Sequence, residues 1–103
     1  MAEVIWSEPA VAQLEAIASY IALDKPEAAR AVVRRIFQVT DRLDSFLRLG
    51  RKIPEFPQPN YRQVRIPPCW IYYRIEGDDV CILHVRRAEY PFRNEDLFVN
   101  EGS

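Results

Sequence analysis

The sequence predicts an α+β fold in which a helix hairpin packs on a small, mostly antiparallel sheet as a two-layer sandwich. Three observations support this prediction. Two stretches in the first half carry helical periodicity and begin with capping signals. Two stretches in the second half are aromatic and β-branched, and a short turn joins them. The length of 103 residues suits one domain over residues 1–103, in which 94–103 form a tail that either docks or stays free.

The chain begins with a predicted strand and a first helix. Val4–Trp6 is a short apolar run that fits a strand. Ser7 follows as a helix N-cap, and Pro9 fits the first turn of a helix. Apolar residues then recur at helical spacing, and the helix is expected to end near Leu23.

A second helix is predicted almost without a loop, so the two helices should form an antiparallel hairpin. Asp24 is the expected cap, and Pro26 fits the first turn. One apolar stripe and an opposite face of arginines indicate a long helix over roughly residues 25–48. Gly50 is the expected residue just after its end.

The second half of the chain reads as three strands after a proline-rich extended loop over residues 51–60. Strands are expected over Tyr61–Ile66, Trp70–Ile75 and Val80–Val85, with a tight turn around Gly77. The element order is therefore β-α-α-β-β-β. A two-residue loop would pair Ile75 with Val80, Tyr73 with Ile82, Ile71 with His84 and Tyr72 with Leu83. One face of this hairpin should cover the helices, and the other should be partly exposed to a partner.

Charge is distributed unevenly, although the net charge is only −1. Residues 30–74 carry ten bases and three acids, whereas 1–29 carry one base and five acids. Residues 75–103 carry three bases and seven acids. The small net charge argues against a protein that coats nucleic acid indiscriminately, and the basic middle suggests an acidic partner.

Several classes of protein are not expected from this composition. One histidine and two distant cysteines make no zinc set, and a glycine-rich phosphate loop is missing, so we expect no metal and no cofactor. Cys69 and Cys81 are expected to be reduced core residues. Without a membrane-length apolar run or a signal-peptide pattern, the chain is expected in the cytoplasm, away from membranes.

An ordered set of segments over roughly residues 3–93 resembles the ParE/RelE superfamily of toxins from bacterial type II toxin–antitoxin systems. The matching segments are Val4-Ile5-Trp6-Ser7, Leu14 to Ile21, Pro26-Glu27-Ala28-Ala29, Leu49-Gly50-Arg51-Lys52-Ile53-Pro54-Glu55, Tyr61-Arg62, Ile71 to Ile75 and Val80 to Arg87. The Gly-Arg-x-x-Pro-Glu stretch favours the ParE branch. The resemblance implies a growth-arresting, plasmid-stabilising toxin held inactive by a cognate antitoxin, in a toxin dimer or a heterotetramer with that antitoxin.

The superfamily contains two chemistries. ParE-like members inhibit DNA gyrase by binding, whereas RelE-like members are ribosome-dependent mRNA endoribonucleases. The nuclease branch typically carries Tyr-Arg-x-x-Tyr on the middle strand, and here Trp70 occupies the arginine position. A gyrase inhibitor that is not an enzyme is therefore the favoured reading. The alternative is a ribonuclease with Arg74, His84 and Tyr90 as catalytic candidates, and a third reading is a non-toxic antitoxin-binding domain.

Two binding surfaces follow from the same resemblance. The target, gyrase or alternatively the ribosome, is expected to meet a cationic patch with an aromatic anchor: Arg51, Lys52, Arg62, Arg86, Arg87, Tyr90 and Arg93. The antitoxin is expected to have a DNA-binding head and an acidic tail that lies on the helix hairpin and along the sheet. Its expected contacts are Ile21, Arg30, Arg34, Phe37, Trp70 and Tyr72. Leu97, Phe98 and Val99 either dock on the domain or lie free.

Overall fold

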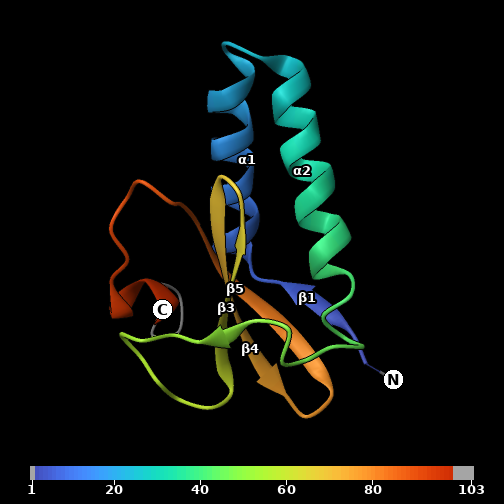
Figure 1. Cartoon of the computed structure of the whole chain (residues 1–103), viewed down its shortest axis with the longest axis vertical. Helices are drawn as coiled ribbons and strands as arrows, with labels where there is room; N and C mark the ends of the chain where they lie inside the picture. The colour runs from blue at the N-terminus through green and yellow to red at the C-terminus, as the bar shows by residue number, and fades with distance from the viewer. Residues whose placement is uncertain (1, 99–103) are drawn as a thin grey trace.

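The computed structural model describes residues 2–98 and confirms the predicted α+β architecture. Its elements in chain order are β1 (Val4–Trp6), α1 (Glu8–Ala22), α2 (Pro26–Thr40), β2 (Arg51–Lys52), β3 (Tyr61–Ile66), β4 (Cys69–Glu76), β5 (Asp79–Arg87) and the 3-10 helix η1 (Asn94–Phe98). The strands form one sheet in the order β1-β5-β4-β3-β2. Only β1 pairs in parallel, and it pairs with β5. Figure 1 shows the two helices side by side, extending beyond one end of the sheet.

Ser7 starts α1 as predicted and also fixes the helix to the sheet. Its side-chain oxygen accepts a hydrogen bond from the Ala10 amide at 3.2 Å, which satisfies one of the unpaired amides of the first turn. The same hydroxyl donates to the Leu83 carbonyl at 3.3 Å, and the Ser7 amide donates to the Ile82 carbonyl at 3.0 Å. One residue therefore ends β1, begins α1 and holds both against β5.

The second helix is shorter than predicted. It begins at Pro26 with Lys25 as its N-cap, and no side chain caps it, so the expected role of Asp24 was wrong. It ends at Thr40, because the hydrogen bonds then change to tighter turns, such as Leu43 amide to Thr40 carbonyl at 3.0 Å. Leu43 is nevertheless fully buried. The apolar stripe thus continues beyond Thr40 through turns, and periodicity alone overestimated the helix.

Gly50 does not end a helix, and the predicted role was wrong. Its amide donates to the Tyr73 hydroxyl at 2.8 Å, deep between the turns after α2 and the sheet. A Cβ atom at this position would lie 2.5 Å from the Gln63 carbonyl oxygen. Glycine is therefore needed for close approach. Positive φ occurs instead at Gly77 (61°), within the described residues, which confirms the predicted hairpin turn.

The hairpin register is confirmed near the turn and wrong beyond it. Ile75 pairs with Val80 and Tyr73 with Ile82, as predicted. A bulge then inserts Leu83, so that Tyr72 pairs with His84 and Ile71 with Val85. The bulge keeps Leu83 and His84 on the same face of β5 in succession. The side chain of Val85 returns to the core that faces the helices.

The loop before β3 is less irregular than expected. Arg51 and Lys52 form the edge strand β2 by pairing with Gln63 and Arg62, and Ile53 makes a bridge with Phe56. Ile53 is fully buried. The sheet therefore gains a short fifth strand, and the loop folds back against the outer face of the sheet.

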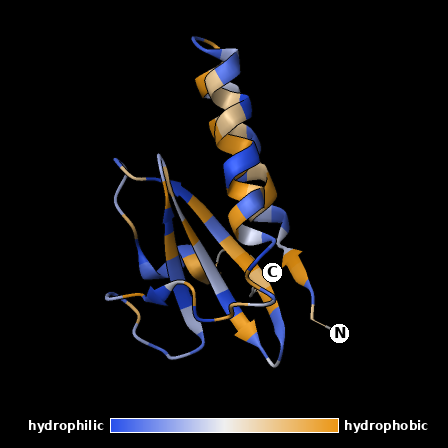
Figure 2. Ribbon diagram, turned by 45° about the vertical axis from the view of Figure 1, so that its right-hand side comes forward, coloured by the Kyte–Doolittle hydropathy of each residue, from blue (hydrophilic) through white to orange (hydrophobic). Residues whose placement is uncertain are grey.

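The inner face of the sheet packs on both helices through an aliphatic core. Figure 2 shows hydrophobic and hydrophilic bands alternating along the helices and the long strands. The fully buried members include Ile36, Ile71, Tyr73, Val80 and Ile82. At about 25 cal/mol per Å² of apolar area, burial of this kind is the main stabilising contribution to the fold.

The outer face of the sheet is covered, contrary to the prediction that it would be partly exposed. Tyr72 is fully buried, and Leu97 of η1 is 3% exposed on the same cluster as Ile53 and Leu83. Residues 94–98 of the predicted tail therefore dock on the domain. Val99 and the remaining tail residues lie outside the described residues. Within residues 2–98, no helix is long and apolar enough to cross a membrane.

Candidate functional site

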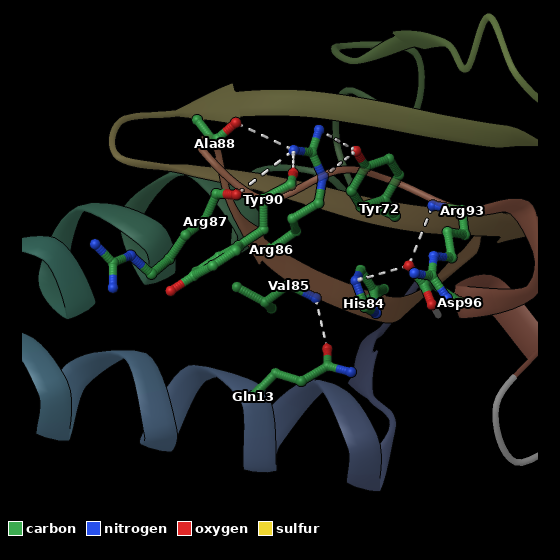
Figure 3. Close-up of polar contacts among 10 residues, drawn as sticks. All are labelled: Gln13, Tyr72, His84, Val85, Arg86, Arg87, Ala88, Tyr90, Arg93 and Asp96. Carbon is green, nitrogen blue, oxygen red and sulfur yellow. Dashed lines mark hydrogen bonds and ion pairs between the residues drawn. The ribbon is translucent and has the colours of Figure 1, made fainter.

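The best-defined polar cluster lies at the C-terminal end of β5, and Arg86 is at its centre (Figure 3). Its Nε and Nη2 donate to the Tyr72 hydroxyl at 3.0 and 2.8 Å. Its Nη1 donates to the carbonyls of Arg87 at 3.5 Å and Ala88 at 3.3 Å, and to that of Tyr90. The guanidinium thus fixes the chain after β5. Its donors are used within the chain, which differs from the target contact predicted for Arg86.

His84 lies beside this cluster with its ring near those of Tyr72 and Phe92, at centroid distances of 5.7 and 6.5 Å. Its side chain is 12% exposed, and its Nε2 lies 4.0 Å from a carboxylate oxygen of Asp96. Burial lowers the pKa of His84, and nearby Arg86 lowers it further, while Asp96 opposes both. Its Nδ1 is buried and has no hydrogen-bond partner within the chain. The ring is therefore favoured in its neutral form.

Arg87 points to the opposite face, toward α1. Its guanidinium lies 4.5 Å from the ring centroid of Tyr20 and 5.5 Å from that of Tyr90, and it forms an ion pair with Glu89. This arrangement joins the end of β5 to the first helix. Like Arg86, Arg87 is only partly exposed.

The three ribonuclease candidates are not brought together. His84 and Tyr90 line one hollow of about 330 Å³ between α1, β5 and the segment after it, to which Gln13 and Asp96 also contribute. Arg74 is absent from its lining. It pairs with Cys81 near the hairpin turn and forms an ion pair with Glu76. A phosphate held by His84 and Tyr90 would therefore lack the cation assigned to it at the sequence level.

The remaining target-contact candidates divide by exposure. Arg51, Lys52, Tyr90 and Arg93 are exposed, and Tyr90 reaches 56%. Arg62 is half-buried and donates to the carbonyls of Pro59 at 3.2 Å and Gly50 at 3.3 Å. The open cationic surface is thus smaller than predicted and lies mainly on β2 and the C-terminal segment.

Trp70 has cationic neighbours that the sequence did not indicate. The guanidinium carbons of Arg51 and Arg65 lie 5.7 and 5.5 Å from its ring centroid. Gln63, Arg65 and Trp70 also line a small hollow against Gly50. Strand pairing explains the arrangement, because Arg65 lies opposite Trp70 across β3 and β4. Arg65 was missed, since only the strand register brings it to Trp70.

A second surface runs along the helix hairpin. Phe37 is 40% exposed, its ring lies 5.2 Å from that of Trp6, and both line an apolar hollow of about 490 Å³ with Leu14 and Val33. A neighbouring hollow lies between α1 and α2 and is bordered by Arg30 and Arg34. Both arginines are exposed, and Arg30 pairs with Glu27 at 2.8 Å.

Of the other predicted antitoxin contacts, Ile21 is half-buried and packs against the core, and Trp70 is half-buried on the outer face. Tyr72 is inaccessible in this structure, because it lies under Phe92 and bonds to Arg86. The structure therefore gathers Ile21, Arg30, Arg34 and Phe37 on the helix hairpin. Trp70 and Tyr72 belong to a separate face.

Chemistry-bearing groups are few in the part of the chain that the structure describes. No three histidine, cysteine or acidic side chains gather there as metal ligands. Cys69 is fully buried, and burial raises the pKa of its thiol, which favours an inert core residue. The surfaces described above are thus better suited to contacts with macromolecules than to bond-making chemistry.

A helix hairpin on an open, mostly antiparallel sheet, with a basic edge and an apolar helical groove, defines a toxin domain of the ParE/RelE superfamily. Residues 4–90 match the family model for the ParE toxin of the type II toxin–antitoxin system parDE. The chain therefore belongs to the ParE toxin family.

Individual relatives agree with this assignment. The chain is 37% identical over 59 residues to Toxin ParE3 of Caulobacter vibrioides, a match that spans 57% of this chain and 58% of that relative. The chromosomal ParDE toxin–antitoxin system from P. aeruginosa contains a similar structure, with a TM-score of 0.71 and 26% identity over 86% of this chain and 98% of that chain. The RelBE2 toxin–antitoxin complex from Mycobacterium tuberculosis shares the fold, with a TM-score of 0.55, 23% identity, and coverage of 82% and 95%.

Proposed function

We propose that this chain is a ParE-type toxin that inhibits DNA gyrase by binding and makes no covalent change in its target. Family membership supports this proposal, because the resemblance in sequence implies gyrase as the target of the ParE branch. The carrying observation is the internal use of Arg86, whose donors all go to Tyr72 and to backbone carbonyls. A ribonuclease would need such a cation free to stabilise a phosphorane.

Inhibition by binding requires only that the toxin prefers one state of its target. If it binds the DNA-cleaved state of gyrase more tightly than the intact state, it shifts the population toward cleaved DNA. The exposed basic residues on β2 supply a cationic surface for that contact, and Tyr90 and Arg93 supply another at the C-terminal segment.

The decisive experiment compares two purified systems. Wild-type toxin should inhibit gyrase supercoiling and increase linear DNA, while mRNA on toxin-treated ribosomes stays intact. Codon-position-specific mRNA cuts would instead support the ribonuclease alternative, and they should weaken in Arg74→Ala, His84→Ala or Tyr90→Phe. Growth without arrest on expression, with neither activity in vitro, would support the non-toxic antitoxin-binding domain.

The partner of the toxin is a cognate antitoxin, consistent with the ParDE and RelBE2 systems that contain its structural neighbours. We place the antitoxin helix on the groove of α1 and α2, because an apolar floor around Phe37 and basic borders at Arg30 and Arg34 fit an acidic amphipathic helix. The DNA-binding head of the antitoxin would remain outside this contact.

Two charge reversals should separate the two surfaces. Arg34→Glu should weaken antitoxin binding at least tenfold and leave gyrase inhibition unchanged, because Arg34 borders the helical groove. Lys52→Glu should do the opposite, because Lys52 lies on the edge strand of the sheet. Calorimetry with the antitoxin tail and a supercoiling assay measure the two effects. If both variants lose both activities together, the division into two surfaces is wrong.

A further inference from the structure

The C-terminal segment beyond the family match is the least expected part of the molecule. The ParE family model ends at residue 90, yet residues 91–98 are folded against the sheet. In Figure 1 this segment leaves the end of β5, swings away from the helices and returns to the sheet as η1. We call residues 91–98 the strap.

Three apolar side chains anchor the strap. The Phe92 ring stacks on that of Tyr72 at a centroid distance of 4.4 Å and an interplanar angle of 11°. Leu97 is almost fully buried in the outer cluster. The Phe98 ring lies 5.4 Å from that of Phe56 and contacts Tyr61 at 6.0 Å. The strap therefore occupies the apolar surface that the outer face of the sheet would otherwise expose.

Few polar contacts hold the strap. Asp96 accepts a hydrogen bond from the Arg93 amide at 3.2 Å and lies 4.0 Å from His84, whose neutral form is favoured by burial. Arg86 binds the Tyr90 carbonyl just before the strap begins. Because the strap has a single fully buried side chain, Leu97, its release costs less than unfolding of the domain.

The strap and the surface around it are chemically complementary. Glu95 and Asp96 give the strap two acids between its apolar anchors. The outer face and its rim carry Arg51 and Arg65 beside Trp70. Neither arginine forms an ion pair with a carboxylate in the described residues. The rim thus retains positive charge that the strap does not neutralise.

We propose that the outer face of the sheet is a binding surface for an acidic peptide segment with aromatic or leucine anchors, and that the strap occupies it in the isolated chain. A partner segment of the same chemistry would displace the strap and gain the contacts with Arg51 and Arg65. The strap therefore sets a threshold for partner binding, since an attached segment competes at a high effective concentration. This inference concerns control by the chain's own segment and does not depend on gyrase being the target.

Native-state hydrogen exchange of the full chain tests whether the strap can be released. The Asp96 amide, which donates to the Arg93 carbonyl at 2.9 Å, should exchange at least a hundredfold faster than the amides of the β4–β5 ladder. Exchange at the same rate as that ladder would mean that the strap opens only when the domain unfolds. That outcome would overturn the proposal without any variant.

Peptide binding tests the surface itself. The probe is a fluorescein-labelled peptide with the sequence of residues 89–98, and its control is a scrambled peptide of the same composition. Leu97→Asp, which introduces a charge into the outer cluster, should bind the probe at least tenfold more tightly than the wild type. Glu95→Gln is the matched control, because Glu95 is exposed on the same turn, and it should bind as the wild type does.

Two further measurements complete the test. Arg65→Glu in the Leu97→Asp background should reduce probe binding at least fivefold and leave gyrase inhibition at the level of Leu97→Asp, so failure here is distinguishable from failure of the proposed function. Protection of the β4–β5 amides confirms that the domain stays folded. If Leu97→Asp fails to fold, Phe92→Ala replaces it. Equal binding of the probe and the scrambled peptide to a folded, strap-released variant would refute the proposal.

Discussion

The two faces of the sheet are covered in different ways. The inner face packs on two helices through mostly aliphatic side chains drawn from α1, α2 and all the long strands. The outer face is covered by a loop and an eight-residue strap, through aromatic side chains and a single buried leucine in η1. The first cover comes before most of the sheet in the chain and belongs to the family fold, whereas the strap follows the family match. A core that defines the fold therefore lies back to back with one that can open.

The largest expected difference between the faces comes from cavity formation. Ile82→Ala removes a fully buried side chain from the inner core and should lower the free energy of unfolding by about 2–5 kcal/mol. Leu97→Ala should mainly raise the exchange rate of strap amides, because local opening relieves the cavity. Urea denaturation and hydrogen exchange measure the two effects. Equal losses in global stability would show that the two faces form one cooperative core.

Two neighbouring tyrosines provide a matched test of the faces. The Tyr73 hydroxyl donates to the Leu47 carbonyl at 2.9 Å and accepts from the Gly50 amide, so Tyr73→Phe leaves a buried amide unpaired and should cost about 1–3 kcal/mol. Tyr72→Phe should cost less, about 0.5–1.5 kcal/mol, because Arg86 keeps its carbonyl acceptors. Thermal unfolding of both variants gives the comparison. A larger loss for Tyr72→Phe would contradict it.

The smallest expected effect is a pH dependence that arises on the outer face. Burial lowers the pKa of His84 below its ordinary value of 6.5, so the unfolded chain binds a proton more readily than the folded one. The stability contributed by neutral His84 is thus fully present above pH 6.5 and is lost as the pH falls below it. His84→Gln should flatten this part of the stability profile, measured by urea denaturation between pH 5 and pH 8. An unchanged slope would mean that the ring is hydrated in the folded state.

Local signals predicted most of the fold. Ser7 could be identified as a cap because its side chain satisfies an amide three residues ahead, and Gly77 because the turn demands positive φ. The two helix starts and three of the strands depend on similarly local patterns. The end of α2 failed, because Leu43 is needed by the core whether or not the backbone around it is helical.

The candidate site was predicted less well. The basic residues were identified correctly as a set, but Arg86 and Arg87 are held by partners that periodicity cannot reveal, including Tyr72 and Tyr20. Gln13 shows the same limit. Its side chain accepts a hydrogen bond from the Val85 amide at 2.7 Å, across 72 residues of sequence. No pattern within one helix indicates such a contact.

The sequence by itself determined the order of elements, the amphipathic faces and the basic middle of the chain, because these depend on residues close together in the chain. Only the tertiary structure decided which cations remain exposed, where the bulge shifts the register, and that the strap closes the outer face. Those outcomes depend on contacts between distant segments, where packing and hydrogen-bond geometry choose among alternatives that local preference leaves equal in free energy.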